Sequence, residues 1–168
     1  MYKRQHQLIH DEQRNKQIID DVKAALRDGR KPLLLTERIE HLEILSDLLE
    51  PHVDNLIIIK GGMGKKAKLL MEEQLNDASP EQSRLIIATG RYIGEGFDDA
   101  ILDTLFLALP ISWKGTLQQY AGRLHRLYEG KEEVQIYDYV DIHSAMLEAM
   151  FKRRSKGCLL YTSDAADD

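Results

Sequence analysis

Short apolar runs alternate along this chain with longer segments in which apolar residues recur every three or four positions. Such runs are typical of strands buried on both faces of a parallel sheet, and the longer recurrence is typical of helices with one buried side. Strands are predicted at residues 33–35, 56–59, 85–88, 104–108 and 134–140. Helices are predicted at residues 15–27, 38–49, 115–126 and 142–152, with another that ends near residue 76. The alternation predicts an α/β fold with a mostly parallel sheet in three layers.

Turn-forming residues agree with these boundaries. Gly29 and Pro32 separate the first helix from the first strand, and Pro51 closes the second helix. Residues 6–14 are polar without a clear period, and they are interpreted as part of a connection from a preceding domain. We expect Thr36, Gly61 and Thr89 to share one edge of the sheet, because ligands bind beyond the carboxyl ends of parallel strands.

The helix at residues 115–126 has two chemically different sides. The apolar side comprises Leu117, Tyr120, Ala121, Leu124 and Leu127. The polar side comprises Gln119, Gly122, Arg123 and Arg126. Two guanidinium groups beside a glycine suit a polyphosphate, because arginine presents a planar fork of donors matched to phosphate oxygens. For two arginines alone, a solvated basic stripe is the favoured interpretation.

Residues 60–66 read KGGMGKK and lead from the second strand into a helix. A P-loop is excluded, because GxxxxGK[ST] needs a glycine at Ile59 and a hydroxyl at Lys66. Glycines at such a turn leave backbone N–H groups free to meet a phosphate, with help from the helix N-terminus and from Lys60, Lys65 and Lys66. A tight turn with solvated lysines explains the pattern equally well, so both interpretations stay open. The shared sheet edge predicts that Lys65 lines the same ligand track as Thr89.

Three segments, in order, resemble the motifs of superfamily 2 helicases of the DEAD/DEAH type. Residues 119–126, QYAGRLHR, resemble motif VI; residues 88–98, ATGRYIGEGFD, resemble motif V; and residues 33–45 resemble the strand and helix of motif IV. Within motif VI, His125 stands where many relatives have glycine. The resemblance implies a RecA-like helicase C-terminal domain, the second of the two domains between which such motors bind ATP.

The resemblance also implies roles for individual residues. Arg126 is expected to be the arginine finger, and Arg123 a second γ-phosphate contact. Further ATP contacts are expected at Gln119, Asp98, Gly96 and Gly122. Contacts to the sugar-phosphate backbone of a nucleic-acid strand are expected at Thr36, Gly61, Gly62, Thr89 and Gly90. ATP is expected to bind with Mg²⁺, whose ligands must come from the preceding RecA-like domain because this chain has no Walker A loop and no DEAD-like acid pair.

Composition limits the partners. The net charge is −5, with 43% hydrophobic and 30% charged residues, so a nucleic-acid site must be a local basic patch. Nucleic acid is the expected partner, with DNA favoured over RNA. The histidines form no metal-ligand pattern, and each is interpreted as a surface or satisfied core side chain. No apolar stretch of about eighteen residues and no secretory leader is found, so a cytoplasmic protein without a membrane partner is expected.

Both chain ends resemble translated sequencing-adapter sequence. Residues 158–168, CLLYTSDAADD, and residues 1–5, MYKRQ, match the two strands of one adapter end. Residues 6–157 are therefore expected to be the helicase C-terminal RecA-like domain, as a fragment of a longer protein.

Two other functions stay open. A Rossmann-like or flavodoxin-like module that binds a nucleotide without motor action would need a glycine-rich turn after the first strand, where the sequence has Thr36-Glu37-Arg38. A stand-alone nucleic-acid-binding regulator is disfavoured by the acidic net charge.

Overall fold

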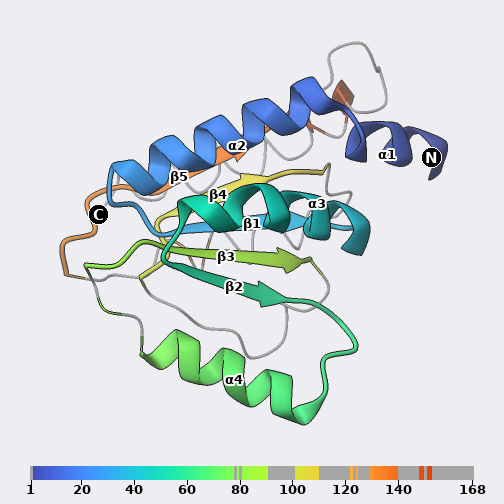
Figure 1. Cartoon of the computed structure of the whole chain (residues 1–168). Coiled ribbons are helices and arrows are strands. Elements are labelled where there is room, and N and C mark those ends of the chain that lie inside the picture. Colours follow the sequence, from blue (N-terminus) through green and yellow to red (C-terminus); the bar gives the residue numbers. More distant parts are fainter. Residues whose placement is uncertain are drawn as a thin grey trace.

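The computed structural model describes residues 2–77, 79, 81–90, 101–109, 122, 124, 129–139, 148, 149, 151 and 152. Its helices are α1 (Tyr2–Ile9), α2 (Glu12–Arg27), α3 (Ile39–Leu49), the short 3-10 helix η1 (Glu50–His52) and α4 (Lys65–Asn76). Its strands are β1 (Pro32–Thr36), β2 (Asn55–Ile59), β3 (Arg84–Thr89), β4 (Thr104–Leu107) and β5 (Gln135–Asp138). The five strands form one sheet in the order β2-β3-β1-β4-β5, and every neighbouring pair is parallel (Figure 1).

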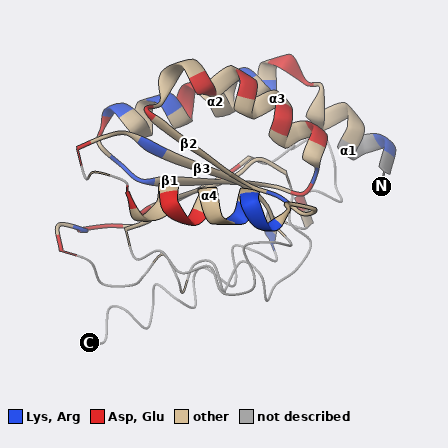
Figure 2. Ribbon diagram, turned by 60° about the horizontal axis from the view of Figure 1, so that its bottom comes forward, with Lys and Arg blue, Asp and Glu red and all other residues tan. Residues whose placement is uncertain are grey.

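Helices cover both faces of this sheet, as the apolar runs predicted. Successive strand residues point to opposite faces, so each strand contributes side chains to the hydrophobic core on each face of the sheet. On β1, Leu34 packs with α2 and α3, whereas Leu33 and Leu35 pack on the side where α4 contributes Met71 and Leu75. Figure 1 shows α4 below the sheet, and Figure 2 shows α2 and α3 together above it. The described residues therefore form a three-layer α/β fold.

Helix α2 begins earlier than the apolar period indicated. The Asp11 side chain caps it by accepting from the Arg14 backbone N–H at 3.0 Å, and Glu12 lies in its first turn. Such an N-cap is typically worth about 1 kcal/mol. At the other end Gly29 has φ 72°, a left-handed conformation that favours glycine. The predicted stop at Gly29 is confirmed.

Residues 6–14, which showed no clear period in the sequence, include the end of α1 and the start of α2, and their role as a connection from a preceding domain stays a prediction. Residues 6–9 complete α1, and Leu8 and Ile9 are buried against Leu109, with Ile44 packed beside them. An eight-residue helix is marginal on its own propensity, so its stability comes from these tertiary contacts. The sequence carries no local sign of them.

An ionic network ties the amino edge of the sheet together. The Arg30 guanidinium donates to Thr104 Oγ1 at 2.6 Å, to the Asp103 carbonyl at 3.0 Å and to Glu133 Oε1 at 3.1 Å. These bonds join the residues that precede β1, β4 and β5. The network lies at the amino ends of the strands, whereas the predicted ligand contacts lie at their carboxyl ends. It therefore stabilises the sheet without occupying the edge at which ligands bind in such folds.

Candidate functional site at the carboxyl edge of the sheet

The parallel sheet brings the ends of β1, β2 and β3 to one edge. Thr36 and Thr89 are register partners at the ends of β1 and β3, and the Gly90 N–H donates to the Thr36 carbonyl at 3.0 Å. On the other side of β3, β2 ends at Ile59 and leads directly into the glycine turn that contains Gly61. Thr36, Gly61 and Thr89 therefore share one edge.

Thr36 is held by a buried polar chain. Its hydroxyl lies 3.1 Å from His41 Nδ1, His41 Nε2 lies 2.8 Å from Asn15 Oδ1, and Asn15 Nδ2 donates to the Ile9 carbonyl at 2.8 Å. Because Asn15 Oδ1 can only accept, His41 carries its proton on Nε2 and Thr36 donates to Nδ1. Thr36 is 1% exposed, so its hydroxyl proton is used inside the fold. For Thr36 to donate to a phosphate, as predicted, its hydrogen bond to His41 would have to break.

The buried imidazole predicts a pH-dependent stability. Burial, assisted by the nearby cation Arg14 and by His10, lowers the pKa of His41 to about 4 from the ordinary 6.5. Between these values the unfolded chain binds more protons than the folded one, so stability is complete above pH 6.5 and falls as the pH drops. Urea denaturation at about pH 4.5 should show a loss of about 2 to 3 kcal/mol from this group relative to about pH 7.5.

The matched variant for this measurement is His41→Gln, which keeps a polar side chain but has no imidazole to titrate. Its stability at neutral pH should be lower, and its loss of stability on acidification should be smaller by about the same 2 to 3 kcal/mol. An equally steep loss in both proteins would contradict the assignment of the pH dependence to His41.

Thr89 differs from Thr36 because its buried hydroxyl has no hydrogen-bond partner among the described residues. The residue is 4% exposed, and within the described part of the chain no group pairs with its Oγ1. It lies two positions after Ile87, so its side chain points to the same face of the sheet, toward α3. A buried hydroxyl without a partner costs free energy unless a ligand or water supplies one. Beside it, a Cβ added at Gly90 would meet no atom within 4 Å among the residues that the structure describes.

The glycine turn has the geometry of an anion site. Gly62 has φ 77°, and Gly64 is the N-cap of α4 without a side-chain hydrogen bond to the helix. The first N–H groups of α4 therefore have no side-chain acceptor from their own cap, and the helix dipole makes this end attractive to anions. Gly61 and Gly62 give the turn a flexible backbone next to Lys65.

The charges along α4 oppose its dipole. Three exposed lysines lie in its first turn, where no acidic residue is present, and acids follow further along. Figure 2 shows the basic and acidic ends of this helix in blue and red. Cations at a helix N-terminus are unfavourable by a few tenths of a kcal/mol each, so folding alone does not explain them. The first-turn lysines are Lys65, Lys66 and Lys68.

Two residues of the predicted arginine helix are described. Gly122 and Leu124 are both helical; Gly122 is exposed, and Leu124 is 2% exposed in the core on the α4 side of the sheet. This agrees with the predicted apolar and polar sides at these two positions. The remaining predicted ATP contacts lie outside the described residues and stay predictions: Gln119, Arg123, Arg126, Asp98 and Gly96.

Sequence inspection missed the contribution of Arg14. Its guanidinium donates to the Ala108 carbonyl at 2.8 Å and to the Tyr139 carbonyl at 3.1 Å, and it lies 5.9 Å from the Tyr139 ring centroid. It thereby joins α2 to the chain just after β4 and β5, at the carboxyl edge. The partners are backbone carbonyls far along the chain, and side-chain patterns give no signal for them.

Among the described helices, none is long and apolar enough to cross a bilayer.

Comparison with known proteins identifies the fold. No protein-family description and no curated protein matches the chain. The solved structure of T4 UvsW superposes with a TM-score of 0.72 at 16% identity, over 93% of this chain and 34% of UvsW. The C-terminal part of the Fun30 ATPase domain superposes with a TM-score of 0.63 at 16% identity, over 77% of this chain and 41% of the Fun30 chain. The chain therefore spans well under half of each, and it has the α/β fold of RecA-like helicase domains.

Proposed function

We propose that this chain is the second motor domain of an ATP-dependent nucleic-acid helicase or translocase. The observation that carries the proposal is the carboxyl edge of the sheet. Along this edge lie a Thr89 hydroxyl without a partner among the described residues, the glycine Gly90, and a lysine-rich start of α4 that has no side-chain cap, on a fold shared with an ATPase domain. Hydroxyls, backbone N–H groups and lysines are the groups that position a sugar-phosphate backbone without reading its sequence.

On the nucleic-acid side, each edge residue has a distinct part. Thr89 supplies the free hydroxyl, while Gly90 leaves room for the strand. Gly61 and Gly62 shape the turn that presents the N–H groups of α4, and Lys65 adds a positive charge. Thr36 shapes this edge from inside through His41, and its own contact with the strand follows only if its hydroxyl turns outward.

On the nucleotide side, the helix around Gly122 and Leu124 is anchored to the sheet by its apolar side. Arg126 acts as the arginine finger, Arg123 contacts the γ-phosphate and Gln119 organises the same face. Asp98 is proposed to face the ribose or the interdomain ATP site, and Gly96 is proposed as a further ATP contact. The exposed Gly122 beside the buried Leu124 supports this orientation. These residues offer mainly cationic and amide donors, so the phosphate loop and the Mg²⁺ ligands belong to the preceding domain.

The first test of the strand track is Lys65→Ala in the protein that includes the preceding domain. Binding to single strands should weaken with little dependence on sequence, and the slope of log K against log salt should decrease by about 1, because one phosphate contact is lost. Fluorescence anisotropy over a range of salt concentrations measures both quantities. Matched DNA and RNA strands would show which polymer is preferred.

Lys16→Ala is the control for this test. Lys16 is equally exposed but lies on α2, on the opposite face from α4, and pairs with Asp20 at 2.8 Å. This variant should bind like the unmodified protein. If Lys65→Ala also leaves affinity and salt slope unchanged, the glycine turn lies off the strand track.

The chain by itself is expected neither to hydrolyse ATP nor to bind it with micromolar affinity. Without the phosphate loop and the Mg²⁺ ligands, solvent-exposed arginines must compete with water and salt for the nucleotide. Isothermal titration calorimetry of the chain with Mg²⁺-ATP measures this. Micromolar affinity would instead favour the alternative function, a Rossmann-like module that binds a nucleotide without motor action.

A further inference from the structure

A cluster of metal-ligating side chains lies where α1 meets α3. His6, His10 and Glu40 each present one ligand atom, and all three atoms lie within 4.8 Å of one another. His10 Nε2 is 2.8 Å from Glu40 Oε1, and the centroids of the two imidazole rings are 4.7 Å apart. The histidines are four residues apart in sequence, but the carboxylate comes from thirty residues further along, so no sequence motif shows the cluster.

The donor set selects the class of metal ion. Two imidazoles and one carboxylate are ligands typical of Zn²⁺, which binds them in tetrahedral geometry and leaves a fourth position for water. At Zn–N distances of about 2.05 Å, tetrahedral ligand atoms lie about 3.3 Å apart. All three side chains are exposed, so small rotations can bring them from their present separations to this value without disturbing the core.

The backbones that carry the ligands are already held together. Leu8 and Ile9, between the two histidines, are buried with Leu109, and Ile44, one turn after Glu40, packs against them. The ligands therefore do not have to be gathered from separate flexible segments, which lowers the entropic cost of binding. A solitary exposed histidine has no such preorganisation.

We propose that His6, His10 and Glu40 form a zinc-class site that staples α1 to α3. The bound cation displaces the proton between His10 Nε2 and Glu40, which is released to solvent or moves to His10 Nδ1; two coordination bonds then replace the hydrogen bond, and His6 is added as a third ligand. Because α1 precedes the rest of the domain, the staple fixes the direction in which the chain enters the fold. The proposal stands independently of the motor function.

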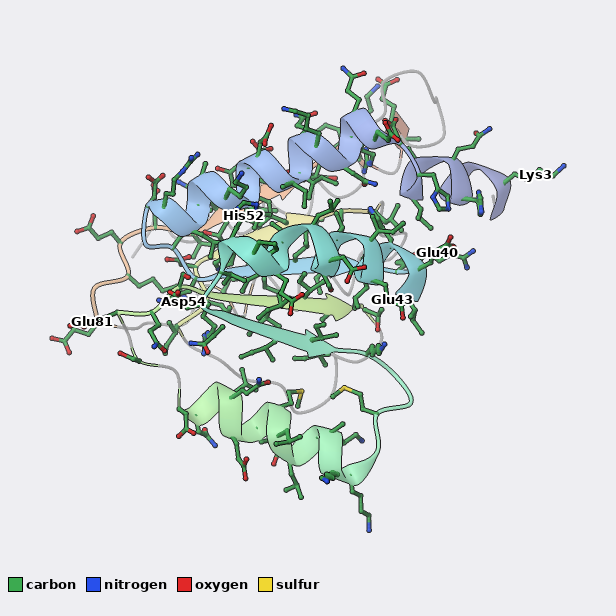
Figure 3. All side chains as sticks on the ribbon, viewed as in Figure 1. Lys3, Glu40, Glu43, His52, Asp54 and Glu81 are labelled. Atoms are coloured by element: carbon green, nitrogen blue, oxygen red, sulfur yellow. The ribbon has the colours of Figure 1, made fainter. Side chains whose placement is uncertain are left out.

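Zinc binding is tested by isothermal titration calorimetry of the full chain with ZnCl₂ near neutral pH. One site of about micromolar affinity is expected, with a rise in thermal midpoint when Zn²⁺ is present in excess. His6→Ala and Glu40→Gln should each weaken binding at least about tenfold, because each removes one of three ligands. The matched controls are His52→Ala and Glu72→Gln, which alter exposed residues of the same types. His52 lies at the other end of α3 from Glu40 (Figure 3), and neither control should change the affinity.

Amide hydrogen exchange tests the staple itself. At a Zn²⁺ concentration that fills the site of the unmodified chain but not the weakened site of Glu40→Gln, exchange in α1 should slow in the unmodified chain and stay unchanged in the variant. Circular dichroism confirms that each variant keeps its helices. The proposal is overturned if the unmodified chain binds no Zn²⁺, or if Glu40→Gln binds as tightly as the unmodified chain. Equal binding in Glu40→Gln would reduce the cluster to an ordinary pair of surface histidines.

Discussion

Replacing Arg126 with alanine is expected to lower nucleic-acid-stimulated ATP hydrolysis by about 10³- to 10⁵-fold in the protein that includes the preceding domain. This corresponds to roughly 4 to 7 kcal/mol of lost transition-state stabilisation. A solvated surface arginine contributes less than about 1 kcal/mol, so the size of the effect separates the two interpretations of the helix. Strand binding should stay within a few-fold, because Arg126 faces the nucleotide in the proposed arrangement.

Arg126→Lys should be impaired almost as strongly, since lysine keeps the charge but loses the planar fork of donors. Steady-state turnover with saturating strand and ATP measures both variants. Arg27→Ala, at an exposed position near the end of α2, is the matched control and should retain normal turnover. A lysine variant with normal turnover would leave only general positive charge at this position, and an active alanine variant would return the helix face to a solvated basic stripe.

The second large effect concerns stability. Phe106→Ala should lower the free energy of unfolding by about 3 to 5 kcal/mol, because a fully buried ring is removed and its surroundings collapse only partly. Phe106 lies on β4 in the core beneath α2 and α3, and its ring stacks on Tyr137 of β5 with centroids 4.5 Å apart. The loss therefore includes an aromatic pair that joins two neighbouring strands.

Urea denaturation followed by circular dichroism measures this change. Leu69→Ala is the control: Leu69 lies on α4, is 59% exposed, and should change stability by less than about 0.5 kcal/mol. If Phe106→Ala were equally mild, β4 could not occupy the buried position next to β1 that its register with Leu34 requires.

The strands were predictable because their chemistry is local. Leu33, Leu34 and Leu35 are apolar in succession because both faces of β1 are covered, and such a run has few other structural explanations. At Gly122 and Leu124, the described residues of the predicted two-sided helix, the exposed and buried positions follow from helical spacing in the same way. Patterns within one element are enough for such inferences.

What escaped prediction depends on contacts between distant parts of the chain. His41 was interpreted only as a surface or satisfied core side chain, and its bonds to Thr36 and Asn15 exist only after α2 and α3 pack together. The inward use of the Thr36 hydroxyl could not be read from a strand-end threonine, because Thr89 has the same local sequence position and no such bond. The order of strands in the sheet belongs to the same class of non-local information.

That strand order has a consequence for synthesis. β1 is made first but lies in the middle of the sheet, and Leu33 pairs with Ile86 and Leu105. At about 5 to 20 residues per second, the ribosome needs roughly 3 to 10 s after Leu33 to reach Ile86. During that interval the apolar β1 has neither strand partner, but α2 is made before it and α3 directly after it, and these helices can shield one of its faces. Early docking of these helices would therefore protect the nascent chain against aggregation before the sheet exists.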